Sequence, residues 1–175
     1  MQKVKLPKQL DPIKNAQKGA RYEGIILSRD MSRLVEAVTD VADDIDIKAM
    51  FDIDAQGLAF FQGNLSTSVK LICQRCNDVY TQVIETDFSF SPYNDTHNID
   101  DLPDVYEPVE VNDHGEINLV ELFEDELMLS LPIVAMHPEK DCKVSANGLT
   151  FGEIEPAVEQ PNPFAVLKEL KRNQE

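Results

Sequence analysis

The chain has 175 residues, of which 42% are hydrophobic, and a formal net charge of −16. This length and apolar content predict one domain with its own core and exclude wholesale disorder, and no apolar run has the length of a transmembrane helix. The first residues lack the apolar region of a secretion signal, and three cysteines do not suit a disulfide framework. We therefore expect a cytoplasmic protein.

Charge is segregated along the chain. Residues 1–33 hold eight bases and three acids, whereas residues 76–139 hold sixteen acids and no Lys or Arg. The acidic segment attracts cationic partners and repels polyanions, so direct contact with a phosphate backbone would fall to the basic N-terminal part. The same segregation is also compatible with a simple role in solubility.

The N-terminal half predicts an arm followed by alternating elements. The arm, residues 1–20, has weak periodicity and is expected to be extended and to offer an edge strand. A strand at 22–27 precedes a helix whose apolar residues run at helical spacing from Met31 to Val41, with Ser28 or Asp30 as its cap. Residues 45–54 alternate between apolar and polar, which is typical of a half-buried strand.

Two further strands are expected at 58–73, with Gly63 as a bulge or twist point, and at 79–90. Together with the strand at 45–54 they predict three consecutive antiparallel strands. Residues 91–113 predict a long acidic loop with a short extended piece at 109–111.

The last part of the chain predicts two helices. Asn118 is the expected N-cap of a helix that reaches about Leu131, and Asn162 with Pro163 is expected to open a short amphipathic helix. In the first helix the inward residues would be Leu119, Leu122, Phe123, Leu127 and Leu131, and the water-facing ones Glu121, Glu124 and Asp125.

The predicted fold class is α+β: an antiparallel β meander with a few packed helices, an extended N-terminal arm and a short C-terminal helix. We expect residues 1–155 to form a single domain that includes the arm and the acidic loop. Residues 156–175 would form a linker and the amphipathic helix.

Cys73-Gln74-Arg75-Cys76 is the most informative motif, because it places two thiols at a predicted hairpin turn. The pair could share a zinc ion, form a redox couple or remain reduced on either side of the turn. A closed zinc site needs four ligands, and Cys142 with His137 would have to complete it, yet nothing in the sequence shows that their segment returns to the turn. A thioredoxin-like motif would open a helix, whereas strands flank this one.

We therefore expect no bound metal and no cofactor, and treat Cys73, Arg75 and Cys76 as a candidate binding site. Arg75 is of interest as the one base, expected to be exposed, that the sequence places beside a strongly acidic segment.

No catalytic constellation is recognisable. His97 and His114 have no Ser or Cys partner in a known motif, and acidic pairs such as Asp43-Asp44 lack the pattern of a calcium loop. The sequence has no glycine-rich phosphate loop. We expect a protein that is not an enzyme, with no small-molecule substrate and no membrane contact.

Several stretches together resemble one bacterial family. They are the opening MQKVKLP, the CQRC turn, YEPVEVN from Tyr106, EDEL from Glu124, the later His137 and Cys142, and PNPFAVL near the end. On these motifs the chain is identified as a member of the YceD family, the large ribosomal RNA subunit accumulation proteins. More distant members carry further cysteines, whereas this chain has none after Cys142.

The resemblance implies a non-enzymatic role in the synthesis, processing or stability of 23S ribosomal RNA and in biogenesis of the large subunit. The implied partner is large-subunit ribosomal RNA or a pre-ribosomal particle, reached in one version through a basic ribosomal protein. Two alternatives stay open: a metal-dependent RNA-processing enzyme that uses the acidic groups, and an adapter that binds a basic ribosomal protein or docks its C-terminal helix on a partner.

Overall fold

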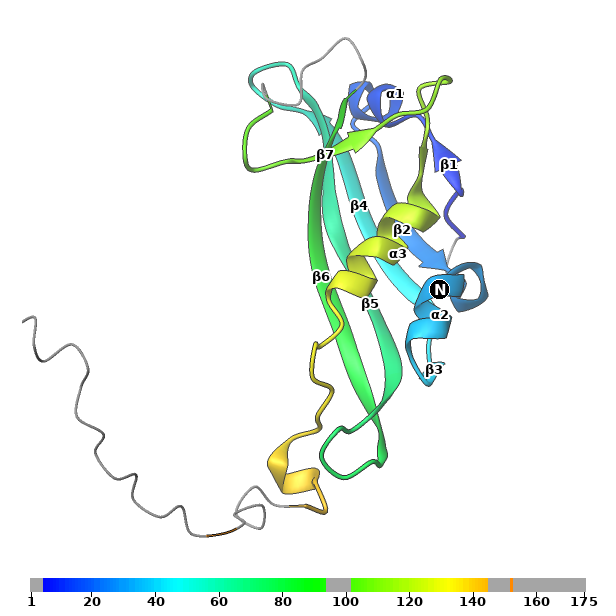
Figure 1. The fold of residues 1–175 in the computed structure, drawn as a ribbon. Helices are drawn as coiled ribbons and strands as arrows, with labels where there is room; N and C mark the ends of the chain where they lie inside the picture. Colours follow the sequence, from blue (N-terminus) through cyan, green and yellow to red (C-terminus); the bar gives the residue numbers. More distant parts are fainter. Residues whose placement is uncertain (1–4, 94–101, 145–151, 153–175) are drawn as a thin grey trace, which may run out of the picture. The chain divides into compact units, whose positions relative to one another are not determined.

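A computed structural model describes residues 5–93, 102–144 and 152 (Figure 1). The chain divides into two compact units, residues 1–143 and 144–175, and every helix and strand described here lies in the first. The C-terminal helix expected after Pro163 lies outside the described residues, and the predicted domain boundary near residue 155 stays a prediction.

A six-stranded sheet forms the body of the first unit. Its strands are β2 (Arg21–Ile26), β4 (Ile45–Ile53), β5 (Ala59–Ile72), β6 (Val79–Tyr93) and β7 (Glu107–Glu110), in that order, and β3 (Asp40–Val41), which pairs with β5. The predicted antiparallel meander is confirmed as β4, β5 and β6. Strand β7 pairs with β6 in parallel, so the sheet is mixed, and β6 extends into the segment that was expected to be loop.

The N-terminal arm differs in part from its prediction. Strand β1 (Gln9–Leu10) pairs with β8 (Ile117–Asn118), but the next residues form a short helix, α1 (Pro12–Gln17), where an extended chain was expected. Asp11 caps this helix by accepting a hydrogen bond from the Lys14 N–H at 2.9 Å, and proline occupies the first helical position. An Asp-Pro pair is a helix start signal, so the sequence did contain the cue.

The helix expected over residues 31–41 is shorter. Helix α2 (Ser32–Ala37) follows a 3₁₀ turn, η1 (Ser28–Asp30), and ends before Asp40 and Val41 join the sheet as β3. Neither Ser28 nor Asp30 caps α2, because Met31 occupies the N-cap position and makes no side-chain hydrogen bond. Val38 and Val41 have helical spacing, but both are β-branched and therefore suit a strand, and Val41 pairs with Val69 of β5 instead of continuing the helix.

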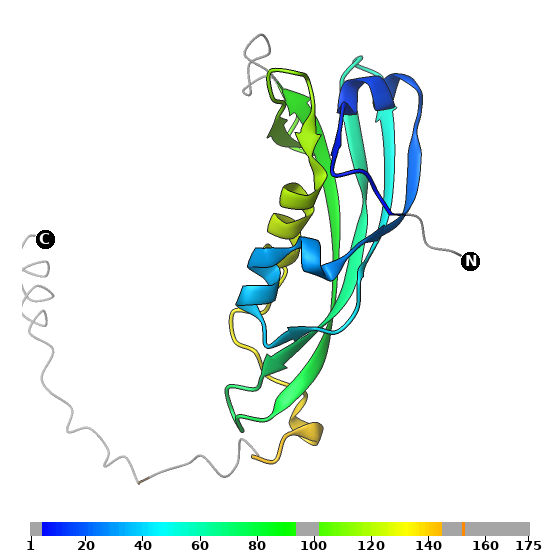
Figure 2. The ribbon, with the colours of Figure 1, turned by 90° about the vertical axis from the view of Figure 1, so that its right-hand side faces the viewer.

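Helix α3 (Leu119–Leu129) begins as predicted and is two residues shorter than expected. The Asn118 side chain accepts hydrogen bonds from the N–H groups of Val120 and Glu121, which confirms the N-cap. Of the residues expected to face inward, Leu119, Phe123 and Leu127 are buried. In Figure 2, α2 and α3 lie on the same side of the sheet.

The expectation that Glu124 faces water is wrong, since only 4% of the residue is exposed. One oxygen of its carboxylate accepts hydrogen bonds from the backbone N–H groups of Arg33 and Leu34, at 2.7 and 3.0 Å, and the other from Arg33 Nε at 3.0 Å. These two N–H groups belong to the first turn of α2, where no intrahelical partner exists. Glu124 therefore serves α2 as the cap that its own sequence does not provide.

The core lies between the two helices and one face of the sheet. Phe51 stacks on Phe61 at 5.0 Å between ring centroids, and Phe88 packs against Phe123 of α3 at 4.8 Å. The largest fully buried side chains belong to Phe51, Phe61, Phe123, Ile26, Met31, Leu34, Ile45, Ile47, Leu65, Leu119, Leu127 and Val69. The strict alternation of β4 reflects this arrangement, because only one face of the strand is covered.

Gly63 lies in the middle of the sheet but is not a bulge. The pairing of β4 with β5 and of β5 with β6 continues without interruption through this residue, opposite Ala49 and Phe88. A Cβ atom at Gly63 would lie 1.8 Å from the carbonyl oxygen of Lys48. The glycine is required here by close approach of two backbones.

Substitution of Glu126 is expected to stabilise the protein. Burial raises the pKa of this carboxyl, and so do the negative charges of Glu107 and Asp125. A raised pKa in the folded state means that ionised Glu126 lowers stability at neutral pH and that this cost disappears as the pH falls below the ordinary value of 4.5. Glu126→Gln should therefore raise the free energy of unfolding at neutral pH by less than about 1 kcal/mol.

Urea titrations at neutral pH and at a pH below 4.5 would check this prediction. Glu121→Gln is the matched control, because it removes an exposed acid from the first turn of the same helix. A gain for Glu126→Gln that is as large at the acidic pH would contradict the electrostatic explanation.

Candidate functional site

The CxxC motif lies at the turn between β5 and β6, as predicted. The Cys73 N–H donates to the Asp78 carbonyl at 2.9 Å, and the Asn77 N–H donates to the Cys73 carbonyl at 2.8 Å. Asn77 has a φ of 60°, the left-handed conformation that asparagine tolerates better than most residues. The turn is therefore closed by backbone hydrogen bonds and holds Cys73 and Cys76 on one tight loop.

The segment after α3 returns to this turn. We call residues 132–143 the strap; it includes a short 3₁₀ helix, η3 (Glu139–Asp141). The Gln74 N–H donates to the Ala135 carbonyl at 2.8 Å, and Lys143 Nζ lies 2.9 Å from Asp78 Oδ2. The sequence did not show whether this segment returns to the turn, and in the structure it does.

The strap brings His137 and Cys142 to the two cysteines of the turn. The ligand atoms of Cys73, Cys76, His137 and Cys142 all lie within 4.8 Å of one another. Cys73 and His137 are buried, while Cys76 and Cys142 are half-buried, and all three cysteines are free thiols. Three cysteine sulfurs and one imidazole nitrogen form a donor set that can hold a soft or borderline metal ion.

The two thiols of the turn differ in acidity. Burial raises the pKa of Cys73, but hydrogen bonds from the backbone N–H groups of Cys76, Arg75 and His137 outweigh it and lower the pKa to about 6. For Cys76, a backbone hydrogen bond from Asp78 lowers the pKa, whereas burial and the neighbouring thiols of Cys73 and Cys142 raise it, and the net shift is upward. The turn therefore favours a thiolate at Cys73.

Tyr80 lies beside the cluster and was not expected from the sequence to belong to this site. The ring of Tyr80 lies 5.4 Å from the ring of His137, and its pKa is raised by burial and by Cys73. The hydroxyl of Tyr80 and the Nδ1 atom of His137 are buried without a hydrogen-bond partner among the described residues. No sequence pattern indicates this position of Tyr80, because it depends on the path of the strap.

Arg75 is half-buried, which corrects the view of it as an exposed base. Its Nη2 atom lies 3.6 Å from the sulfur of Met136, and Nη1 is buried without a partner among the described residues. The guanidinium thus packs on the strap. A role of Cys73, Arg75 and Cys76 in binding a partner stays a prediction.

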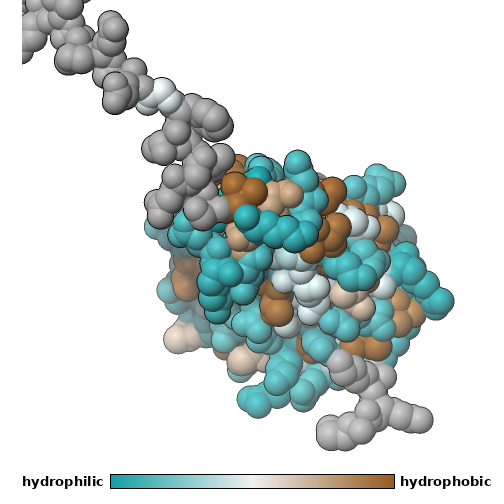
Figure 3. Space-filling view, turned by 90° about the horizontal axis from the view of Figure 1, so that it is seen from below, coloured by the Kyte–Doolittle hydropathy of each residue, from teal (hydrophilic) through white to brown (hydrophobic). Residues whose placement is uncertain are grey.

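Apolar side chains are exposed at this end of the molecule. They belong to the strap, where Ile133 is 97% and Val134 50% exposed, and to the adjoining strand ends, with Ile72 at 51% and Val79 at 54%. In the view from below, hydrophobic surface lies between hydrophilic side chains (Figure 3). The strap is thus held to the turn by few apolar contacts.

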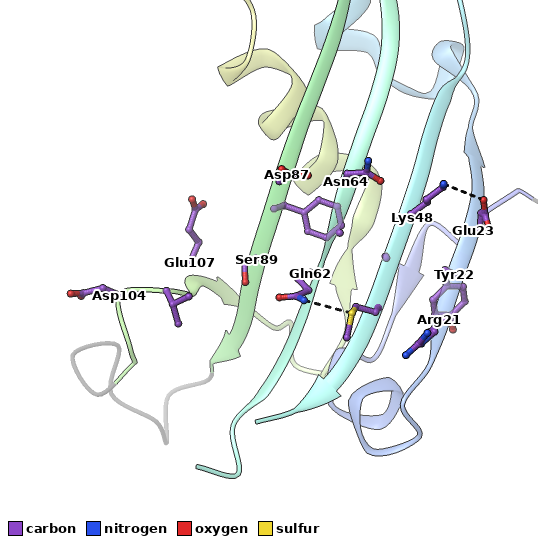
Figure 4. Close-up of a pocket in the computed structure, with 15 residues that line it drawn as sticks. Arg21, Tyr22, Glu23, Lys48, Gln62, Asn64, Asp87, Ser89, Asp104 and Glu107 are labelled. Carbon is purple, nitrogen blue, oxygen red and sulfur yellow. Dashed lines mark hydrogen bonds and ion pairs between the residues drawn. The ribbon is translucent and has the colours of Figure 1, made fainter. Parts of the chain in front are cut away.

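A separate groove of about 960 Å³ lies on the outer face of the sheet. Figure 4 shows Arg21, Lys48 and the acid Glu23 toward β2 and β4, and only acids among the charged residues toward β6 and β7. Lys48 Nζ lies 3.6 Å from Glu23 Oε1, so part of this charge is paired within the groove. The side chains labelled there are Arg21, Tyr22, Glu23, Lys48, Gln62, Asn64, Asp87, Ser89, Asp104 and Glu107. This mixture of signs gives the groove no single ligand chemistry.

The basic N-terminal part uses much of its charge internally. Lys5 and Lys8 both contact Asp30, at 2.9 and 3.3 Å, and Lys14 lies 2.8 Å from Asp11. Arg33 is bound to Glu124 and Asp125 of α3. Four of the eight bases that the sequence offered for contact with a phosphate backbone are therefore paired with acids of the same molecule.

Comparison with known proteins places the chain in a family. The model of the family described as "Large ribosomal RNA subunit accumulation protein YceD" matches residues 61–171, which include the turn, the strap and α3. The chain belongs to the YceD family. A YceD relative from Haemophilus influenzae, named Large ribosomal RNA subunit accumulation protein YceD, is 45% identical over 173 residues, covering 98% of this chain and 99% of the relative. The resemblance stated from the sequence motifs is thereby confirmed.

No solved structure matches this YceD family member. Its described residues include no helix that is long and apolar enough to cross a membrane. The family description names an accumulation protein and no enzymatic activity.

Proposed function

We propose that this chain is a non-enzymatic, cytoplasmic factor that supports the accumulation of large-subunit ribosomal RNA during assembly of the large ribosomal subunit. One observation carries the proposal: 45% identity, spanning nearly the whole of both chains, with a relative that is named for this role. The family model that matches residues 61–171 carries the same description.

The charge distribution favours a basic protein as the direct partner. Exposed carboxylates lie along β7, the turn after it and the start of α3, including Glu107, Glu110, Asp113 and Glu121. The segment that contains them carries no Lys or Arg. Because Lys5, Lys8 and Lys14 are paired with Asp30 and Asp11, part of the N-terminal positive charge is neutralised, and we take the acidic surface as the stronger long-range attractor. A ribosomal protein rich in lysine and arginine has the complementary chemistry.

Depletion of this protein in its own host is expected to lower the ratio of large-subunit to small-subunit ribosomal RNA, because the large-subunit RNA would lose a factor needed for its accumulation. Total RNA from depleted and replete cells would be compared by electrophoresis and by probes for each precursor. An unchanged ratio, with the protein shown to be absent, would refute the proposal.

Complementation would then test the acidic surface. A variant with Glu107→Gln, Glu110→Gln and Asp113→Asn should restore the ratio less well than wild type and should capture less basic protein from lysate at low salt. Glu85→Gln is the control, because this exposed acid of β6 does not line the groove that Glu107 shares with Asp87. Cleavage of precursor ribosomal RNA by the pure protein with magnesium or manganese would instead establish an enzyme.

A further inference from the structure

We propose that Cys73, Cys76, His137 and Cys142 bind one structural Zn²⁺ ion that fastens the strap to the turn between β5 and β6. The proposal replaces the expectation of a metal-free turn and does not depend on the proposed function. Three thiolate sulfurs and one imidazole nitrogen form one of the common donor sets of closed structural zinc sites. Hard cations such as Mg²⁺ and Ca²⁺ prefer oxygen ligands, which this cluster lacks.

The separation of the four donors suits a tetrahedral ion. Ligand atoms at zinc–sulfur and zinc–nitrogen distances of about 2.3 and 2.0 Å lie about 3.5–3.8 Å from one another at the corners of a tetrahedron. Cys76 Sγ and His137 Nε2 are 3.8 Å apart, and every other pair of ligand atoms lies within 4.8 Å. The longest separations need to shorten by no more than about 1 Å when the ion enters.

The backbone of the turn fixes the two cysteines that it carries. The Cys73 N–H donates to the Asp78 carbonyl at 2.9 Å, and the Asn77 N–H donates to the Cys73 carbonyl at 2.8 Å. These hydrogen bonds hold both cysteines on one tight loop, so the turn offers two ligands in a fixed arrangement. Two of the four donors come from one tight turn and two from the strap, and Cys76 and His137 are separated by 61 positions in the chain. One ion would therefore join two distant segments.

The strap also needs an anchor that apolar packing does not provide. Among residues 132–144 only His137 is buried, and Ile133, Val134 and Met136 are 97%, 50% and 44% exposed. Further links of the strap to the turn and to β6 include one backbone hydrogen bond, a surface ion pair, weak contacts to sulfur and the ring contact between Tyr80 and His137. Ordering an exposed segment costs backbone conformational entropy, which apolar packing here does little to offset. Metal ligation at His137 and Cys142 would supply the missing anchor.

The first measurement is the metal content of the full chain, purified without a polyhistidine tag or chelator and in a reductant that does not bind metal. We expect close to one zinc per chain by mass spectrometry. Replacement of zinc by Co²⁺ should give the visible bands of a tetrahedral cobalt site and sulfur-to-cobalt charge transfer in the near ultraviolet. These two readouts use the wild-type protein, so they do not depend on whether a variant folds.

Variants then assign the ligands. Cys142→Ser and His137→Gln should each lower zinc affinity at least about tenfold, while circular dichroism retains the signal of the sheet. His114→Gln is the matched control, since His114 is exposed and lies away from the cluster; it should keep its zinc.

Three results would overturn the proposal. One is less than about a tenth of a metal ion per chain together with no cobalt spectrum after addition of Co²⁺. Another is stoichiometric iron or copper in place of zinc. The third is a Cys73–Cys76 disulfide in metal-free protein isolated from cells, which would indicate a redox pair.

Discussion

Gly63→Ala is expected to destabilise the protein by more than about 3 kcal/mol, because one added methyl group meets backbone that has nowhere to move. The new Cβ atom would lie 1.8 Å from the Lys48 carbonyl oxygen and 2.9 Å from the Ala49 Cα. Both belong to β4, which is paired on one side with β2 and on the other with β5. Relief would require the two central strands to separate and lose hydrogen bonds.

Urea unfolding followed by circular dichroism would measure this effect. Gly57→Ala is the matched control: Gly57 lies in the turn between β4 and β5 with a φ of 87° and no neighbouring atom within 4 Å of an added Cβ. The control should cost only about 1 kcal/mol, from the conformation alone. Equal losses in the two variants would show that close approach of the strands is not what Gly63 provides.

Glu124→Ala is expected to cost about 2–3 kcal/mol, because it removes a buried carboxylate that caps a helix and pairs with the half-exposed Arg33. The substitution leaves the N–H groups of Arg33 and Leu34 without an acceptor and Arg33 Nε without its carboxylate. It also opens a gap between α2 and α3. Glu124→Gln keeps the volume and one acceptor oxygen, so it should lose less.

Asp125→Asn distinguishes the effect of the buried Glu124 carboxylate from the effect of removing a negative charge at the surface. Asp125 also contacts Arg33, but 54% of its side chain is exposed, and such pairs contribute less than about 1 kcal/mol. Thermal unfolding of the three variants should therefore rank Glu124→Ala well below Glu124→Gln, and Asp125→Asn close to wild type. If Glu124→Ala behaved like Asp125→Asn, the carboxylate would not be the cap of α2.

The sheet could be predicted from the sequence wherever a local pattern decides the structure. The alternation of β4, the turn at the two cysteines and the Asn118 cap are all recorded in neighbouring residues, and each is confirmed. The expected water-facing position of Glu124 failed for the opposite reason. Its partner, Arg33, lies ninety-one positions earlier, and helical periodicity on α3 carries no information about which helix covers that side.

The cysteine cluster likewise has one part that the sequence predicts and one part that it does not. Cys73 and Cys76 are recognisable as a pair because their spacing is local. His137 and Cys142 complete the cluster only because the strap turns back after α3, and no pattern in residues 132–144 determines that path. The parallel pairing of β7 with β6 was missed for the same reason, since it follows a connection through residues 94–106.

The pairing of β1 with β8 sets an order of events during synthesis. The meander of β4, β5 and β6 consists of neighbouring hairpins, which can close as soon as each has left the ribosome. Strand β1 is made first, yet Gln9 and Leu10 find their partners only when Asn118 and Ile117 have emerged. A nascent chain that stalls before that point would leave the backbone of Gln9 and Leu10 unpaired, while Lys5 and Lys8 could already contact Asp30, so the attachment of the N-terminal segment is finished in two separate steps.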